Sequence, residues 1–401
     1  MTISAWLQSL RGKRVAVLGY GISNRPLVTL LLSAGLNVCV RDRSVPGDLP
    51  DCETRFGADY LAELSEDVIF RSPGIRPDLP EIADALSRGA LLTSEMEVFF
   101  RLCPCPVIGV TGSDGKTTTA SLIAALLEAD GKTVHLGGNI GTPLLDKVPL
   151  IAPEDYAVVE LSSFQLMTFT ESPHIAVLTN ITPNHLDWHK NFDEYASAKT
   201  NIFRFQKPGD RLVFDANSVA GVPLKHVLGE HNRRHFATAV EALGGIISRE
   251  AIARVAENFP GVPHRLEFIR EVKGVKYYND SIASSPDRTI AGLEAFGQRV
   301  ILIAGGKDKG IPYDALGPAL REKVKLLVLN GPTSEKIVTA AGTSVPNKRC
   351  GDLAEAVRAA SEAAEAGDIV LLSPASTSFD QFRNFEERGE KFRELVSILE
   401  N

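Results

Sequence analysis

Long apolar runs are missing from this sequence of 401 residues. No stretch reaches the about 18 consecutive apolar residues that a membrane helix needs, so no membrane association is expected. Residues 1–21 contain neither the apolar core nor the small-residue cleavage site of a signal peptide. Cysteine is also scarce. Its five residues are scattered and odd in number, which favours a reducing, cytoplasmic location over a disulfide framework.

An excess of basic charge is absent as well. The 43 Lys and Arg residues against 50 Asp and Glu residues give a net charge of −7, so no nucleic-acid partner is expected from bulk charge. The hydrophobic content of 44% is that of an ordinary soluble globular protein. A chain of this length predicts about two to four domains.

Short runs of Val, Ile and Leu alternate with segments of helical period, a pattern typical of parallel α/β sheets. We predict strands at 14–18, 37–40, 68–70, 107–110, 157–160, 175–178, 275–278, 300–304, 325–329 and 369–372, and helices at 26–33 and 116–128. Two Pro-rich passages, 102–106 and 259–263, interrupt the pattern and indicate linkers. The sequence therefore predicts three consecutive α/β domains, at 1–103, 104–262 and 263–401.

A glycine-rich segment, GVTGSDGKT at 109–117, follows a predicted strand and opens a predicted helix. In a phosphate-binding P-loop, backbone N–H groups wrap phosphate oxygens and the helix N-terminus adds positive potential. Lys116 is expected to reach the β- and γ-phosphates of ATP or GTP, and the Thr117 hydroxyl to bind Mg²⁺. Gly109 and Gly115 are one residue further apart than in the common motif, so an ordinary glycine-rich turn is the alternative.

Two further strands end in residues suited to metal binding. Glu160 ends YAVVE and is a candidate Mg²⁺ ligand, with a helix-capping acid as the alternative. The segment NITPNHLDWH at 180–189 places His185 and neighbouring carboxylates after another strand. A second metal site and a merely solvated loop are both open there.

A glycine turn in the first domain, GYGISN at 19–24, follows a strand, and Asp42 ends the next strand. Such spacing resembles a dinucleotide fingerprint, but Asn24 replaces the third glycine. With a phosphate loop downstream, a nucleotide-diphosphate contact is the preferred interpretation, and NAD(P) binding is the alternative.

Other segments extend the comparison along the whole chain: GGNIGT, VVELSSFQL, YASAKTNIF, GVPHRLE, NDS and SPASTSFDQFRNFEERG. Together with the phosphate loop they resemble the Mur ligase family, and the last segment resembles its D-glutamate-adding members. The resemblance implies a Rossmann-like N-terminal domain for a UDP sugar, a central P-loop ATPase domain and a C-terminal Rossmann-like domain for the amino acid. It implies that ATP converts the carboxylate of UDP-N-acetylmuramoyl-L-alanine to an acyl phosphate, which the amine of D-glutamate attacks.

The resemblance also implies roles for single residues. A first Mg²⁺ is held by Thr117 and Glu160, and a second lies near His185. Lys199 matches the position of a lysine that is carbamylated in members of the family. The implied catalytic residues are Lys116, Glu160, His185, Lys199 and Arg265. The implied nucleotide contacts are Gly112, Ser113, Asp114, Gly115, Lys116, Thr117, Thr118, Asn232, Arg265 and Asp280.

Substrate contacts are implied in all three domains. The UDP sugar meets Gly21, Ile22, Ser23 and Ser72, with Asn139 on the muramoyl-alanine. D-Glutamate meets Ser284, Lys309, Ser378, Phe379 and Phe385.

The chain departs from the family pattern in three places. Ile282 replaces a lysine, and we expect Arg288 or Lys307 to compensate for the lost cation. His235 stands for an asparagine in the segment that begins at Gly229, near the adenine. The stretch between Lys199 and Gly229 is short for the family, which predicts a trimmed central domain.

The resemblance implies a cytoplasmic protein that uses ATP and two Mg²⁺ ions, and we expect a monomer. Three alternatives differ in their chemistry. Another Mur-type or folylpolyglutamate-type ligase would accept a different amino acid. A P-loop switch protein would hydrolyse nucleotide without either substrate, and an oxidoreductase would bind NAD(P)H.

Overall fold

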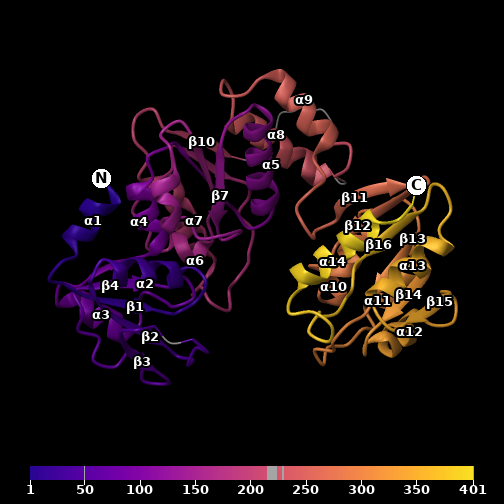
Figure 1. Ribbon diagram of the computed structural model, residues 1–401, viewed down its shortest axis with the longest axis horizontal. Helices are drawn as coiled ribbons and strands as arrows, with labels where there is room; N and C mark the ends of the chain where they lie inside the picture. The colour runs from indigo at the N-terminus through magenta and orange to yellow at the C-terminus, as the bar shows by residue number, and fades with distance from the viewer. Residues whose placement is uncertain (49, 215–223, 228–229, 401) are drawn as a thin grey trace. The chain divides into compact units, whose positions relative to one another are not determined.

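The computed structural model describes residues 1–48, 50–214, 224–227 and 230–400. These residues form three β-sheets (Figure 1). They divide into two compact units, one of residues 1–221 with 234–255 and the other of 222–233 with 256–401. The predicted α/β class with three consecutive sheets is confirmed, whereas the predicted domain limits stay a prediction.

The first sheet has five parallel strands in the order β3-β2-β1-β4-β5. The strands are β1 (Arg14–Leu18), β2 (Asn37–Asp42), β3 (Glu53–Phe56), β4 (Val68–Arg71) and β5 (Leu91–Thr93), and the helices are α1 (Ile3–Ser9), α2 (Asn24–Ser33), α3 (Pro80–Ser87) and α4 (Glu95–Leu102). The chain moves from β1 outward to β2 and then returns to β4 on the other side of β1. In open parallel sheets ligands bind where the strand order reverses in this way, so a ligand crevice is expected at the carboxyl ends of β1 and β4.

The second sheet is also five-stranded and parallel, in the order β10-β9-β6-β8-β7. Its strands are β6 (Val107–Thr111), β7 (Val134–Gly138), β8 (Tyr156–Glu160), β9 (Ile175–Leu178) and β10 (Arg211–Phe214). Its helical segments are α5 (Lys116–Ala129), η1 (Leu145–Leu150), α6 (Ser163–Leu166) and α7 (Phe192–Arg204), followed by α8 (Glu230–Ala242) and α9 (Arg249–Asn258). The strand β6 is central, so the loop after it has neighbours from both β8 and β9.

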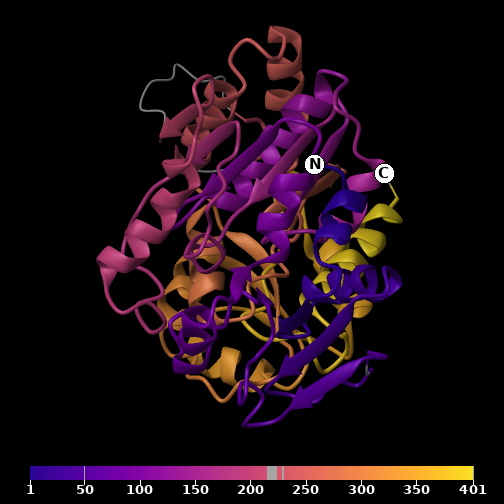
Figure 2. The same ribbon diagram turned by 90° about the vertical axis from the view of Figure 1, so that its left-hand side faces the viewer.

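One hydrophobic core joins the first two sheets. It runs from Trp6 and Phe70 through Phe99 and Cys105 to Phe169, all buried. The linker predicted at 102–106 does connect α4 to β6, but it packs against this core instead of separating two bodies. Figures 1 and 2 show the indigo α1 at the start of this unit, beside the N label.

The third sheet has six strands in the order β11-β12-β16-β13-β14-β15. All pairs are parallel except β11–β12, which is antiparallel with an irregularity between Phe268 and Arg270. The strands are β11 (Glu267–Val272), β12 (Val275–Asn279), β13 (Val300–Ala304), β14 (Val324–Asn330), β15 (Asn347–Cys350) and β16 (Ile369–Leu372), and the helices are α10 (Pro286–Glu294), α11 (Leu316–Lys323), α12 (Ser334–Ala341), α13 (Leu353–Ala363) and α14 (Phe385–Ser397).

Both faces of this third sheet are buried. In β13, Val300 and Leu302 pack into one apolar cluster while Ile301 and Ile303 pack into the other. Side chains alternate between faces along a strand, so a continuous apolar run is what a sheet covered on both faces requires.

Candidate active site

The glycine-rich loop lies between β6 and α5, as predicted. Gly112 and Gly115 have φ values of 151° and 76°, a region that residues with a Cβ rarely adopt. A Cβ on Gly112 would collide with Thr179 Oγ1, and one on Gly115 with the His235 ring. Both positions therefore require glycine. The amides of Ser113 and Asp114 already donate to Asn180, so the loop presents an anion mainly with the first turn of α5, the end of a helix at which anions bind.

Lys116 begins α5 and lies against this loop. Its ammonium group donates to the carbonyl oxygens of Gly112, at 3.0 Å, and Ser113, at 2.9 Å. The lysine is thus held beside the amides that are expected to wrap the phosphates.

Three predicted residues meet at the carboxyl end of β8. Glu160 is buried, and its two carboxylate oxygens accept one hydrogen bond each, from Thr117 Oγ1 and Asn139 Nδ2, both at 2.7 Å. Hydroxyl, amide and carboxylate oxygens are the donor types that Mg²⁺ prefers. The chemistry of this group fits a magnesium ion held by Thr117 and Glu160.

No larger ligand cluster accompanies it. Within residues 1–48, 50–214, 224–227 and 230–400, no group of three or more His, Cys, Asp or Glu side chains is arranged to hold a metal ion.

Lys199 is a buried lysine on α7. Its Nζ donates to Gly112 O at 2.6 Å and lies 4.7 Å from the centroid of the Tyr195 ring. Burial, with the charge of Lys116 as a second cause, lowers the pKa of Lys199 to about 7. A substantial share of this amine is neutral near pH 7, which is the form that reacts with carbon dioxide.

Ser113 and Asp114 are fixed by the segments that follow β9. Ser113 Oγ lies 2.7 Å from Tyr195 Oη and accepts from the Thr182 amide at 2.8 Å. The Asp114 amide donates to Asn180 Oδ1 at 3.0 Å. The sequence analysis missed Tyr195 and Asn180, because nothing local links them to a loop some 65 residues or more earlier.

The segment after β9 separates its two histidines. His185 is exposed, has a φ of 54° and lies with its ring centroid 5.0 Å from that of Phe164. His189 is buried, with Nε2 3.0 Å from Ser163 Oγ and Nδ1 3.4 Å from Glu194. His185 is therefore the one open to a ligand, and His189 anchors the loop.

The predicted UDP contacts gather in the crevice between β1 and β4. A Cβ on Gly19 would lie 2.6 Å from Ser72 Oγ, so the two turns touch. Buried Asn24 ties them together, because its amide donates to Gly19 O at 2.9 Å and to Ser72 Oγ at 3.2 Å. Gly21, Ile22 and Ser23 form the outer, solvent-accessible part of the turn.

Asp42 is used inside this domain. Its carboxylate accepts from the amide of Tyr20 at 2.7 Å and from that of Ser44 at 2.9 Å. In a dinucleotide site such an acid binds the ribose hydroxyls. Here it braces the glycine turn, which weighs against the NAD(P) interpretation.

In the second unit, the predicted ribose contact Asp280 is buried. Its oxygens accept from Ser373 Oγ at 2.8 Å and the Leu266 amide at 3.3 Å. Desolvation raises the pKa of Asp280 to about 7. Arg265 is exposed between His264 and Leu266, which have φ values of 62° and 45°. Asp280 thus shapes the Arg265 turn, and its carboxylate retains lone pairs that can accept from a ribose hydroxyl.

The predicted D-glutamate contacts follow the carboxyl ends of β12, β13 and β16, which are adjacent. Ser378 is buried, Phe385 is half-buried, Phe379 and Lys309 are exposed, and Ser284 Oγ donates to Ile282 O at 3.1 Å. Arg288 and Lys307 are both exposed. These are the two cations expected to compensate for the lysine that Ile282 replaces.

A residue that sequence analysis missed links these loops. Arg388 of α14 is buried and donates to Ser281 Oγ at 3.0 Å, Ser281 O at 2.9 Å and Ser376 O at 3.1 Å. Desolvation lowers the pKa of Arg388 to about 10. Arg388 lies in a charged stretch of the sequence, and such a stretch predicts exposed side chains.

The predicted adenine segment is only partly described. Gly229 lies outside the described residues. Asn232 and His235 lie on α8, and His235 is the residue against which a Cβ on Gly115 would collide. His235 therefore packs over the phosphate loop.

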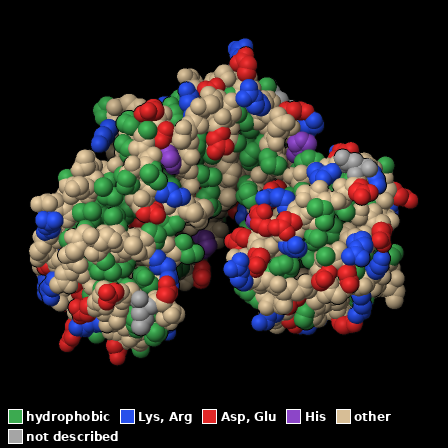
Figure 3. Space-filling view, in the orientation of Figure 1, with side chains coloured by type: hydrophobic (Ala, Val, Ile, Leu, Met, Phe, Trp, Pro, Cys, Tyr) green, Lys and Arg blue, Asp and Glu red, His purple; other side chains and the backbone are tan. Residues whose placement is uncertain are grey.

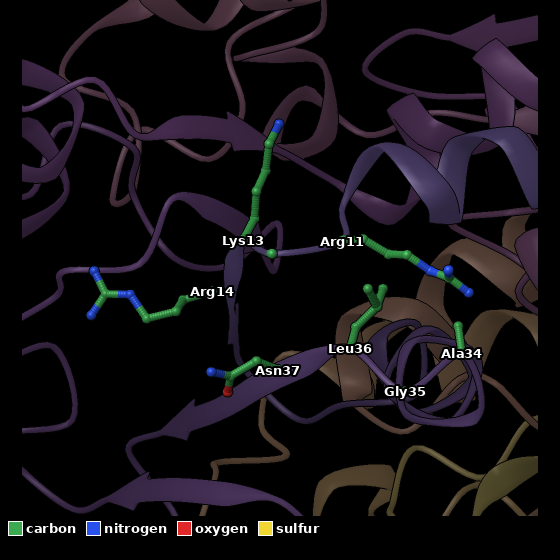
Figure 4. Close-up of a pocket in the computed structure, with 8 residues that line it drawn as sticks. Arg11, Lys13, Arg14, Ala34, Gly35, Leu36 and Asn37 are labelled. Carbon is green, nitrogen blue, oxygen red and sulfur yellow. The ribbon is translucent and has the colours of Figure 1, made fainter.

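Other surface features do not compete with this site. A cavity of about 350 Å³ lies at the amino ends of β1 and β2, opposite the UDP crevice, and Arg11, Lys13 and Arg14 on its rim point in three different directions (Figure 4). Acidic and basic side chains are interspersed on the face in Figure 3. None of the helices in the described part of the chain combines the length and apolar character needed to cross a membrane.

Two family models match the chain: the Mur ligase middle domain over residues 110–254, and the Mur ligase, glutamate ligase domain over residues 264–376. A UDP-N-acetylmuramoylalanine--D-glutamate ligase of Acetivibrio thermocellus is 46% identical over 456 aligned positions, covering 98% of each chain. A ligase of the same name from Ruminiclostridium cellulolyticum is 44% identical with the same coverage. Because the alignments are longer than this chain, the relatives contain segments that it lacks.

Solved structures show the same fold. A UDP-N-acetylmuramate-alanine ligase from Thermotoga maritima is similar with a TM-score of 0.56 and 16% identity, covering 96% of this chain and 99% of that one. The MurF ligase of Thermotoga maritima, in complex with ADP, is similar with a TM-score of 0.53 and 19% identity, covering 98% of this chain and 96% of that one.

Proposed function

This chain belongs to the Mur ligase family, and we propose that it joins D-glutamate to UDP-N-acetylmuramoyl-L-alanine while converting ATP to ADP and phosphate. The observation that carries the proposal is the 46% identity, over nearly the full length, to a relative named for that reaction. The phosphate loop with Glu160, Thr117 and Asn139 beside it supplies a site suited to the ATP half of the chemistry.

The reaction has two steps. A carboxylate oxygen of the acceptor attacks the γ-phosphorus of ATP, the bond to the β–γ bridging oxygen breaks, and ADP leaves. The amine of D-glutamate then attacks the acyl carbon, loses a proton and expels phosphate. Because the first step brings two anions together, positive groups must screen them.

This chain's own residues would divide that work. Lys116 and the amides in the first turn of α5 would screen the phosphates, and Thr117 with Glu160 would hold Mg²⁺, which supplies further positive charge when bound. A second Mg²⁺ would lie near His185, supported by Lys199 as its carbamate. Arg265 would reach the transferring phosphoryl group, and the loops around Lys309 and Ser378 would hold D-glutamate.

The protein would act in the cytoplasm as a monomer. The NAD(P) alternative finds little support, since Asp42 is engaged with the amide of Tyr20.

Phosphate release tests the proposal when ATP, UDP-N-acetylmuramoyl-L-alanine and D-glutamate are each omitted in turn. We expect release only in the complete mixture, and loss of at least about 100-fold in Lys116→Ala, since a group that stabilises developing charge is worth about that much. Lys207→Ala, at an exposed lysine of the same domain, is the matched control.

Other outcomes point to other functions. Release with a different amino acid from a panel would indicate another ligase of the family. Release without either substrate would indicate a nucleotide switch, and unchanged product formation in Lys116→Ala would overturn the assignment of the phosphate loop.

A further inference from the structure

Arg76 connects the first sheet's domain to the second at an unusually dense set of contacts. It lies in the turn between β4 and α3. Its guanidinium donates to both carboxylate oxygens of Glu194, at 3.0 and 3.1 Å, and to Trp188 O at 2.6 Å. It also forms a two-point contact with Asp78, at 2.7 and 3.0 Å.

The surrounding residues reinforce this junction. The Arg76 guanidinium carbon lies 4.9 Å from the centroid of the Trp188 ring. Trp188 Nε1 donates to Gly74 O at 3.2 Å, and Lys190 pairs with Asp78 at 2.5 Å. The turn at 72–78 and the loop at 185–194 are thereby bound to each other on both sides of Arg76.

The two segments carry different halves of the proposed site. The 72–78 turn begins with Ser72, in the UDP crevice. The 185–194 loop begins with His185 and runs into α7, which holds Lys199 beside the phosphate loop. A shift of the turn on binding a UDP sugar would therefore be passed by Arg76 to the residues that meet the phosphates.

Cohesion of the unit does not depend on this arginine, because the shared apolar core already joins its two sheets. A second arginine, Arg101, pairs with Glu171 at 2.7 Å and contacts Thr170 across the same two domains, away from both proposed substrate segments. A partly exposed ion pair adds only about 0–1 kcal/mol to stability. Arg101 therefore serves as a control for an ion pair that joins the two sheets and contributes only to stability.

We propose that Arg76 is a positioning residue, which couples binding of the UDP sugar in the crevice beside Ser72 to the placement of the His185 loop and α7. The inference rests on the proposed function for the identity of that sugar nucleotide. It assigns Arg76 no contact with the reacting atoms.

Trp188 fluorescence reports on the coupling without any turnover. The sequence has only two tryptophans, so Trp6→Phe leaves Trp188 as the sole emitter. Titration with UDP-N-acetylmuramoyl-L-alanine, without ATP, should change its emission in a saturable way. In Arg76→Met we expect the change to fall by at least about threefold while calorimetry still detects the ligand, and in Arg76→Lys we expect an intermediate response. An unchanged response in Arg76→Met would overturn the proposal.

Steady-state kinetics separates positioning from stability. In Arg76→Met we expect kcat to fall by about 10- to 100-fold, the usual cost of losing a supporting group around a metal site, with the KM for the UDP sugar altered less than about threefold. Arg101→Met also removes an arginine that pairs across the two sheets, and it should leave kcat within about twofold. Equal kcat in the two variants would assign Arg76 a structural role only.

The two proposals fail in different ways. If the unaltered protein makes no product from D-glutamate, the proposed function is wrong, but the fluorescence titration still measures whether a UDP sugar moves Trp188. If the unaltered protein is active and Arg76→Met is fully active, only the coupling is wrong.

Discussion

Lys199 shows how the surroundings of one side chain can change its chemistry. It is almost fully buried, it donates to Gly112 O, and its pKa is lowered to about 7. The first cause is desolvation, which penalises the charged form, and the second is the nearby Lys116. The fraction of neutral amine therefore rises as the pH increases through about 7.

That neutral amine is the basis of a prediction on carbamylation. We expect Lys199→Ala to lower the activity by about 10- to 100-fold, as for other groups that support a metal site. Short carboxylic acids should restore part of the lost activity. In ¹³C NMR with labelled bicarbonate, a carbamate signal should be present at pH 8 and weaken below about pH 6, where the amine is protonated. Lys207→Ala is again the control, and near-normal activity of Lys199→Ala would remove the assignment.

At the scale of an element, α5 is bounded by two glycines with nearly the same backbone and different surroundings. Gly115, its N-cap, has a φ of 76°, and Gly131, just after its C-cap, has a φ of 77°. A Cβ on Gly115 would collide with the His235 ring, whereas a Cβ on Gly131 would meet nothing within 4 Å. Alanine substitutions at the two positions therefore distinguish the cost of backbone strain, which both share, from the cost of a steric collision, which arises only at Gly115.

We expect Gly131→Ala to cost about 1–2 kcal/mol of unfolding free energy, the price of left-handed backbone in a residue with a Cβ. Gly115→Ala should cost more and also weaken ATP binding, because the His235 ring must move. Urea unfolding and nucleotide titration measure both effects. Adding His235→Ala to Gly115→Ala should recover only the part of the lost unfolding free energy that exceeds the loss in Gly131→Ala. Recovery of the whole loss would show that the backbone at Gly115 is unstrained.

At the scale of the whole molecule, each compact unit buries one carboxyl group with a strongly raised pKa. Glu95 of α4 accepts from the Leu145 amide at 3.2 Å, and Asp280 accepts from Ser373. Desolvation is the first cause in both, raising each pKa to about 7. Each of these two carboxyl groups therefore binds more protons in the folded unit than in the unfolded chain between about pH 4 and 7, so its contribution to stability falls as the pH rises through this window.

Calorimetry at pH 6 and pH 8 should resolve this effect in each unit. We expect a lower unfolding temperature of the second unit at pH 8 by a few degrees, since about 1 kcal/mol corresponds to about 2–4 °C in domains of this size. In the first unit Lys199, with its pKa lowered to about 7, acts in the opposite sense over the same range. Glu95→Gln should therefore make the first unit more stable at pH 8 than at pH 6, and Asp280→Asn should reduce the pH dependence of the second unit only. The same change in both units from either variant would show that they unfold together.

Much of the fold could be predicted from the sequence because its signals are local. The central strands are continuous apolar runs, and the predicted strands at 14–18 and 300–304 match β1 and β13. The strands that were missed include β3 and β15, which lie at sheet edges and have few buried residues. Without an apolar face, an edge strand has no period for a sequence pattern to reveal.

By itself the sequence determined the parallel α/β class, the phosphate loop and the acid at the end of β8, since each depends on residues close together in the chain. Only the tertiary structure decided that Glu160 lies between Thr117 and Asn139, that Arg76 binds Glu194 from 118 residues away, and that Lys199 loses water. Hydrogen bonds between distant segments and the desolvation of a charge arise from packing, and packing is a property of the folded chain.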